Sequence, residues 1–175
     1  MLNSFFCSII LVFLFSCSNS DQEIKDLEEY KGPMQEAINI EILHSDSSVV
    51  IIKITASRQL IYLDGNQEYP NGIYIEFYNE DGSLSTILQG NKGFYDKKED
   101  LYRIFGDVKI HNISKNQKLN TEELFWRPQE EKVYTERFVT IETDGEVIKG
   151  EGLTANQDFS SYRITKPTGR ISIQE

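Results

Sequence analysis

The sequence predicts an all-β fold, a twisted β-jellyroll built like a solenoid from stacked two-strand rungs. Short segments with apolar residues two apart recur along the chain, at 72–77, 106–111, 138–142 and 169–173. Their matching positions Ile75, Val108, Val139 and Ile171 lie 33, 31 and 32 residues apart. No window of helix length carries apolar residues at helical spacing. A fixed period carried by strands indicates rungs that bury their apolar faces only by stacking.

Residues 1–16 have the pattern of a lipoprotein signal peptide. Residues 5–15 form an almost unbroken apolar run that is too short to span a bilayer as a helix. The run ends in Leu14-Phe15-Ser16-Cys17, which resembles a bacterial lipobox. This resemblance implies that Cys17 is acylated and becomes the new N-terminus. The alternative is an ordinary secretory signal that contains a chance cysteine.

The composition of the remaining chain limits its partners. The only cysteines are Cys7 and Cys17, so the mature chain has no disulfide framework. The formal net charge of −10 disfavours nucleic acid and flat docking on anionic lipid, since both attract basic surfaces. Any membrane attachment is therefore expected to come from acyl chains.

A polar, lipid-anchored tether is expected at residues 17–36, followed by the β-jellyroll domain at residues 37–175. The tether is acidic and contains Gly32-Pro33, which interrupts regular structure. Strands are expected within the domain at 49–54, 59–63, 73–78 and 83–89. Turn residues at 79–82 and 144–146 each predict a hairpin.

The glycines at 90–93 and 150–152 precede similar strand pairs in two of the repeats. A phosphate-binding loop would need a strand, the loop and a helix in succession, together with a Gly-Lys-Ser/Thr end. Neither feature is present, so we interpret these glycines as corners between rungs.

The sequence offers no catalytic constellation and no structural zinc site. Its two histidines, His44 and His111, lie far apart, and adjacent carboxylates on a strand point to opposite faces. A carbohydrate hydrolase would need carboxylates clustered on one inward face. We therefore expect a protein that is not an enzyme and has no cofactor.

One apolar face per strand is expected to point inward and to line a lipid groove. The candidates are Ile73, Ile75, Phe77, Tyr102, Ile104, Val108, Ile110, Val139 and Ile141. An open groove for acyl chains and a fully packed core require the same alternation, so both interpretations stay open.

The last strand is expected to be a docking edge for another chain. Arg170, Ile171, Ser172 and Ile173 lie close to the end of the sequence. An uncovered terminal strand exposes backbone groups that can pair with a partner strand. Fraying, or a cap from elsewhere in the chain, is the alternative.

Together these features resemble the LptC family, the periplasmic component of lipopolysaccharide export, and in particular its lipoprotein-type relatives in Bacteroidetes. The resemblance covers roughly residues 35 to 173. The segments that carry it are 69–78, 106–110, 119–126, 133–135, 138–139, 148–153 and 162–164. It implies the twisted β-jellyroll that LptA, LptC and the OstA-like part of LptD share.

The resemblance also implies a function without covalent chemistry. The protein would take lipopolysaccharide from the LptBFG ABC transporter, hold its acyl chains in the groove and pass it to LptA. Its partners would be the transporter jellyroll and an LptA-like jellyroll at the C-terminal edge. It would lie in the periplasm on a lipid anchor, with the inner membrane expected and the outer membrane as the alternative. The competing hypothesis is a structural envelope lipoprotein with a closed β core and no lipid ligand.

Overall fold

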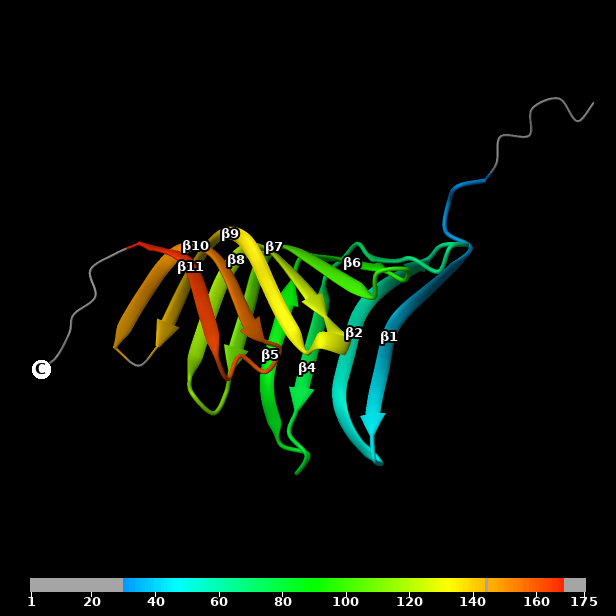
Figure 1. Cartoon of the computed structure of the whole chain (residues 1–175). Helices are drawn as coiled ribbons and strands as arrows, with labels where there is room; N and C mark the ends of the chain where they lie inside the picture. The colour runs from blue at the N-terminus through cyan, green and yellow to red at the C-terminus, as the bar shows by residue number, and fades with distance from the viewer. Residues whose placement is uncertain (1–29, 144, 169–175) are drawn as a thin grey trace, which may run out of the picture. The chain divides into compact units, whose positions relative to one another are not determined.

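The computed structural model describes residues 30–143 and 145–168, and the described residues from Gly32 onward belong to one unit. Within this described part, eleven strands form a single sheet (Figure 1). Every pairing in it is antiparallel. The prediction of an all-β, jellyroll-like fold is therefore confirmed.

The strands follow one another with short connections. They are β1 (Gln35–Asp46), β2 (Val49–Ile61), β3 (Gln67–Tyr69), β4 (Ile73–Tyr78), β5 (Leu84–Gly90), β6 (Lys92–Asp96), β7 (Leu101–Asn112), β8 (Gln117–Arg127), β9 (Lys132–Thr143), β10 (Glu146–Asn156) and β11 (Tyr162–Thr168). A short 3-10 turn, η2 (Pro128–Glu130), joins β8 to β9. The hairpins predicted at 79–82 and 144–146 are confirmed, because β4 pairs with β5 and β9 with β10.

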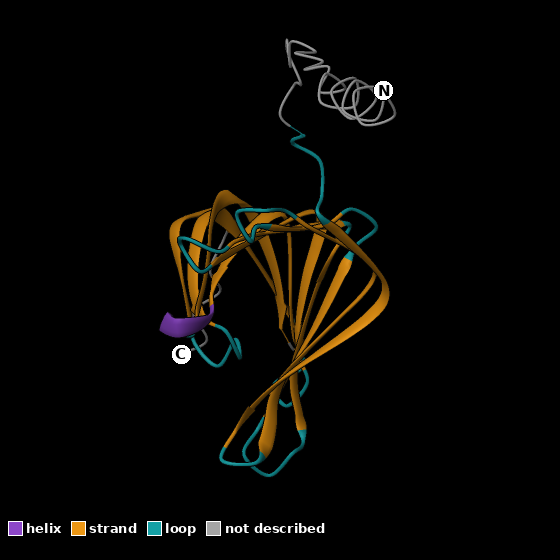
Figure 2. Ribbon diagram, turned by 90° about the vertical axis from the view of Figure 1, so that its right-hand side faces the viewer, coloured by secondary structure: helices purple, strands orange, loops and turns teal. Residues whose placement is uncertain are grey.

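Two long strands divide their length between different neighbours. Strand β2 pairs with β4 through residues 52–55 and with β3 through residues 60–61. Strand β7 pairs with β5 through residues 109–112 and with β6 through residues 101–105. Because β3 also pairs with β6 and β4 with β5, these six strands close a ring. From β7 the sheet continues through β8, β9 and β10 to β11, and the strands curve in an arc (Figure 2).

Bulges bend the long strands near their middles. In β7, residues 106 and 107 interrupt the register with β8 between Phe105 and Val108. Gly106 and Asp107 both have positive φ, at 77° and 49°, as expected of an extra residue in a bulged strand. Ile104 and Val108 lie on either side of this bulge, and both belong to the buried core.

The core lies on the inward face of this sheet. Burial alternates strictly along β4, where Ile73, Ile75 and Phe77 are buried and the residues between them are partly exposed. Strand β2 supplies Ile52 and Ile54 to the same cluster, and a single cluster contains the buried apolar side chains of the described residues. Alternation of this kind is what one buried and one solvated sheet face produce.

Candidate lipid-binding interior

All nine candidate groove residues lie in this one cluster. Three come from β4, four from β7 and two from β9. The most exposed of them is Tyr102, at 6% relative accessibility, and five of them are fully buried. The inward face is therefore continuous across the sheet, and protein side chains fill it in this structure.

Several residues that the sequence analysis did not select share the interior. They are Ile52, Ile54, Tyr69, Leu88, Leu119, Leu124, Trp126, Val133, Leu153, Ala155 and Phe159. Most of them alternate along β2, β8, β9 and β10, so the signal used for β4 would also have found them. Phe159 is different, because it lies in the turn between β10 and β11 and has no strand periodicity.

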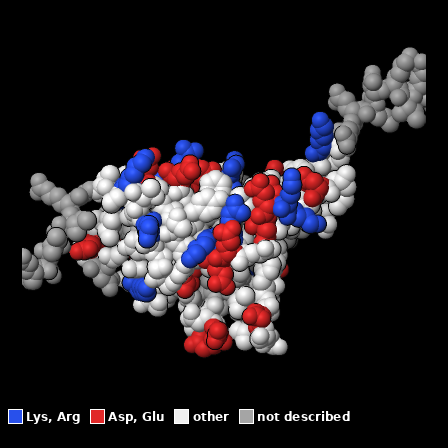
Figure 3. Space-filling model, viewed as in Figure 1, with Lys and Arg blue, Asp and Glu red and all other residues white. Residues whose placement is uncertain are grey.

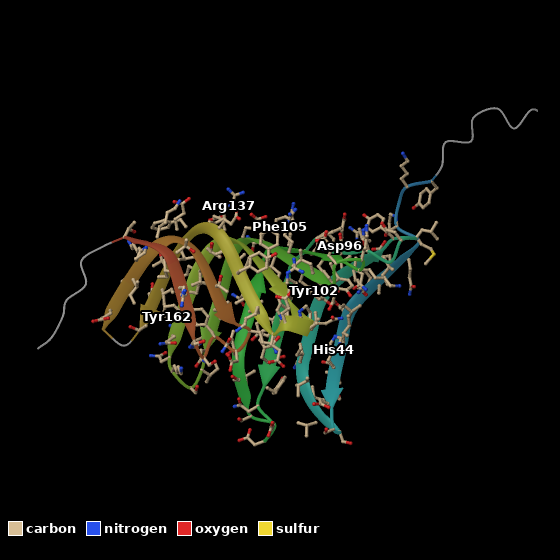
Figure 4. The ribbon with its side chains drawn as sticks, viewed as in Figure 1. His44, Asp96, Tyr102, Phe105, Arg137 and Tyr162 are labelled. Atoms are coloured by element: carbon tan, nitrogen blue, oxygen red, sulfur yellow. The ribbon has the colours of Figure 1, made fainter. Side chains whose placement is uncertain are left out.

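A row of aromatic rings crosses the interior from β6 to β4. Tyr95 lies 4.5 Å from Tyr102, which stacks on Trp126 at 4.7 Å between ring centroids. Trp126 in turn meets the ring of Phe77 edge to face at 5.3 Å. Figure 4 labels Tyr102 within the curl of the sheet, whereas Phe105 and Arg137 lie along its outer surface. Aromatic pairs in these arrangements stabilise the interior by more than the burial of their apolar surface alone.

Phenol groups at one end of this row are kept protonated. Burial raises the pKa of Tyr102, and the nearby phenols of Tyr69 and Tyr95 raise it further. Burial also raises the pKa of Tyr69, whose hydroxyl donates to Gln67 Oε1 at 2.7 Å. Burial and the hydrogen bond donated to Asp100 raise the pKa of Tyr95 to about 12. The three phenols at this end of the interior are therefore neutral at physiological pH.

The outer face has the opposite chemistry. Lys53 pairs with Glu76 at 2.6 Å, and Glu123 pairs with both Arg103 and Arg137. Figure 3 shows acidic and basic side chains intermingled along the strands. These partly exposed ion pairs keep this face in water and contribute little stability.

One hollow on the surface is lined by a mixture of polar and apolar residues, with polar residues in the majority. It has a volume of about 720 Å³, and its lining includes Asn39, Glu41, Thr55, Tyr74 and Gln89. Of the nine candidate residues, only Ile73 contributes to this lining. This hollow is therefore not the apolar groove that the sequence predicts, and acyl chains would have to enter the interior.

The sheet ends in two strands that have a free edge. Strand β1 pairs with β2 and strand β11 with β10, and neither has a second neighbour among the described residues. On β1, Ile38 and Leu43 are more than half exposed. The predicted docking residues Arg170, Ile171, Ser172 and Ile173, and the predicted lipidation site Cys17, lie outside the described residues.

The described part of the chain contains no group of three or more His, Asp, Glu or Cys side chains that is suited to a metal ion. Within residues 30–143 and 145–168, no helix has the length and apolar character needed to cross a bilayer. The curled antiparallel sheet and its apolar interior define the class of the protein as a β-jellyroll.

Comparison with known families then places the chain within that class. Residues 4–166 match the family model described as Lipopolysaccharide-assembly, LptC-related. The chain therefore belongs to the LptC family, and its membership implies a role in lipopolysaccharide transport in the periplasm. A search of curated proteins found no match.

Proposed function

We propose that this protein is a bridge that takes lipopolysaccharide from the LptBFG transporter and hands it to LptA for export to the outer membrane. The observation that carries this proposal is the continuous apolar face between the two edge strands. Such a face matches acyl chains, which gain free energy when they leave water. The saccharide part of lipopolysaccharide would stay in water outside the apolar interior.

The interior must open for this function, because side chains fill it in this structure. Closed packing is also what the competing hypothesis of a structural lipoprotein would require. The two hypotheses differ in whether a lipid can displace these contacts.

The two free edges suggest how neighbouring proteins would attach. We propose that β1 receives the transporter jellyroll and that residues 170–173 receive the LptA-like jellyroll. Pairing along an edge satisfies backbone groups and extends one inward face into the next. A proline at position 171 or 173 removes a backbone donor, so one of Ile171→Pro and Ile173→Pro should reduce capture of the LptA-like partner. Unchanged capture by both folded variants would contradict this assignment.

The anchor is proposed to be acylated Cys17, held in the inner membrane. Two or more acyl chains give stable attachment, whereas one chain gives only reversible binding. Metabolic palmitate labelling of the wild type and of Cys17→Ser measures this, and equal labelling of the two would contradict it.

The lipid function can be tested with Trp126, the only tryptophan of the chain. Trp126 is 1% exposed and stacks in the interior, so an entering acyl chain should change its emission. We expect a saturable emission change when the full-length protein in detergent is titrated with lipopolysaccharide. The same oligosaccharide without acyl chains should produce no change. A folded protein that responds to neither molecule would contradict the proposed function.

A further inference from the structure

The β10–β11 turn (residues 157–161) reaches across the sheet to strands that are distant from it in pairing order. Strand β5 is separated from β10 by β7, β8 and β9. Even so, the backbone carbonyl of Asp158 accepts hydrogen bonds from Thr86 on β5 and Asn112 on β7, both at 2.7 Å. Figure 1 shows this turn beside β5, in agreement with these contacts.

Further hydrogen bonds hold both ends of the turn. The indole Nε1 of Trp126 donates to Gln157 Oε1 at 2.9 Å, and the amide of Gln157 donates to the carbonyl of Glu131 at 2.9 Å. Lys115 donates its Nζ to the carbonyl of Ser160. The turn is therefore fastened to several elements and closes the curl of the sheet.

Phe159 fills the interior from this turn. Its side chain is fully buried in the core cluster, and its ring stacks on Tyr162 at 5.2 Å. Its φ is +54°, a backbone conformation that glycine adopts readily but that is uncommon for a bulky residue. The surrounding contacts hold the backbone in this strained conformation so that the ring can point inward.

The surface beneath the turn is a polar row beside an apolar space. Thr86 and Asn112 lie directly opposite each other on β5 and β7, and Gln117 lies opposite Asn112 on β8. Thr86 and Asn112 are almost completely buried. The buried Oε1 of Gln117 has no hydrogen-bond partner within the described structure. This row thus offers two donors, both of which bond the turn, and one acceptor without a partner among the described residues.

The turn resembles the start of an acyl chain. In an ester- or amide-linked acyl chain, a carbonyl group is followed directly by an apolar alkyl chain. Asp158 supplies the carbonyl and Phe159 the apolar group. We infer that this place is a subsite for the linkage and first carbons of an acyl chain, and that the turn occupies it until lipid arrives. This inference rests on the proposed lipid function.

The chemistry of the subsite fits such a ligand. The ligand carbonyl would accept from Thr86 and Asn112 in place of Asp158, so the two buried donors would never be left unpaired. A hydroxyl or amide N–H on the same chain would donate to Gln117 Oε1. The alkyl chain would take the space of the Phe159 ring and continue toward Trp126. Exchange of the turn for lipid would therefore keep these two donors paired and the apolar space filled.

The main test uses Phe159→Ala, which removes the ring from the subsite and keeps the donors Thr86 and Asn112. If the site is open only about a tenth of the time in the wild type, the variant should bind lipopolysaccharide about tenfold more tightly. A purely structural role for Phe159 predicts weaker or unchanged binding. Binding is measured by titration of the full-length proteins in detergent, after circular dichroism has confirmed folding.

A second variant, Thr86→Val, keeps the test decisive if Phe159→Ala does not fold. It removes one of the donors to Asp158, so hydrogen exchange at the amides of Gln157 and Phe159 should become about 2- to 10-fold faster. Lipopolysaccharide binding should not tighten, because the same donor serves the ligand. The matched control is Thr121→Val, since the Thr121 hydroxyl donates to the carbonyl of Phe138 at 2.9 Å and to none of the turn residues.

Lipopolysaccharide should also accelerate exchange at these turn amides in the wild type, and leave the β4–β5 amides unchanged. If the wild type binds lipopolysaccharide while turn exchange stays constant and Phe159→Ala binds no more tightly, the subsite is wrong and the proposed function survives. If the folded wild type binds no lipopolysaccharide, the proposed function fails and the subsite fails with it.

Discussion

Tyr102 illustrates how single residues make the interior neutral and rigid. Its ring lies between Tyr95 and Trp126, and its hydroxyl lies near the phenol of Tyr69. Burial disfavours the charged phenolate, which is why the pKa of Tyr102 lies above its usual value of 10. A neutral phenol can stay in an apolar interior, whereas a phenolate cannot.

The raised pKa of Tyr102 predicts a loss of stability at alkaline pH. Above pH 10 the unfolded chain releases this proton while the folded chain retains it, so the free energy of unfolding falls as pH rises. The expected slope is about 1.4 kcal/mol per pH unit for each such tyrosine. Urea unfolding of wild type and Tyr102→Phe between pH 8 and 11 measures it. The free energy of unfolding of the variant should fall less over this range than that of the wild type. If the two free energies fall in parallel with pH, this explanation is wrong.

Alternation within single strands was sufficient to predict that the nine candidate side chains point inward. It works for Ile75 because β4 has no bulge before Phe77, and for Ile104 and Val108 because each lies to one side of the β7 bulge. It gives no information on Phe159, whose position depends on hydrogen bonds to strands far away in sequence. Whether the nine residues contact lipid stays a prediction.

Among the elements, the β10–β11 pair depends on close backbone approach at Gly150. A Cβ at this position would lie 2.6 Å from the carbonyl oxygen of Lys166 and 2.4 Å from Cγ2 of Ile164. Both atoms belong to β11, so only glycine lets this edge strand lie close to β10. The sequence analysis interpreted this glycine as a corner between rungs, whereas the structure places it inside a strand pair.

Gly150→Ala should therefore loosen β11 selectively. We expect a cost of about 1–3 kcal/mol, typical of overpacking, and faster hydrogen exchange in β11 than in β4 and β5. Exchange measured by mass spectrometry on full-length protein tests this.

The control for that experiment is Gly82→Ala in the β4–β5 turn. Gly82 has a φ of +80°, and an added Cβ would meet no atom within 4 Å. The control should destabilise through backbone strain alone and leave β11 exchange unchanged. Equal β11 exchange in the two variants would show that the close approach at Gly150 is not what holds the strand.

The hairpins were predictable because their turn residues act locally, but the ring of six strands was not. The pairings of β2 with β3 and β4, and of β7 with β5 and β6, depend on where the long strands bend. Bulges such as that at Gly106 become recognisable only once the partner strand is known. The sequence analysis also assigned no strand to residues 35–46, where alternation is weak and most side chains are exposed.

At the scale of the molecule, one sheet combines an apolar inward face, a polar outward face and two edges that are free among the described residues. Each property suits the proposed bridge, in which the interior would hold acyl chains and the edges would join neighbouring jellyrolls. The repeat of strands could be predicted because every rung needs the same alternation. Opening of the interior could not, because a packed core and a groove have the same sequence pattern.

The most direct test of the bridge is photo-crosslinking in cells from the two faces of β4. Phe77 points inward and is 3% exposed, whereas Tyr74 on the same strand is partly exposed on the outer face. Each is replaced in turn by p-benzoylphenylalanine, which is also aromatic, and Tyr102 provides a second inward position. After a check of folding, we predict lipopolysaccharide adducts from positions 77 and 102 and none from position 74. Folded variants that give no adducts from either inward position, or equal adducts from both faces, would contradict the account.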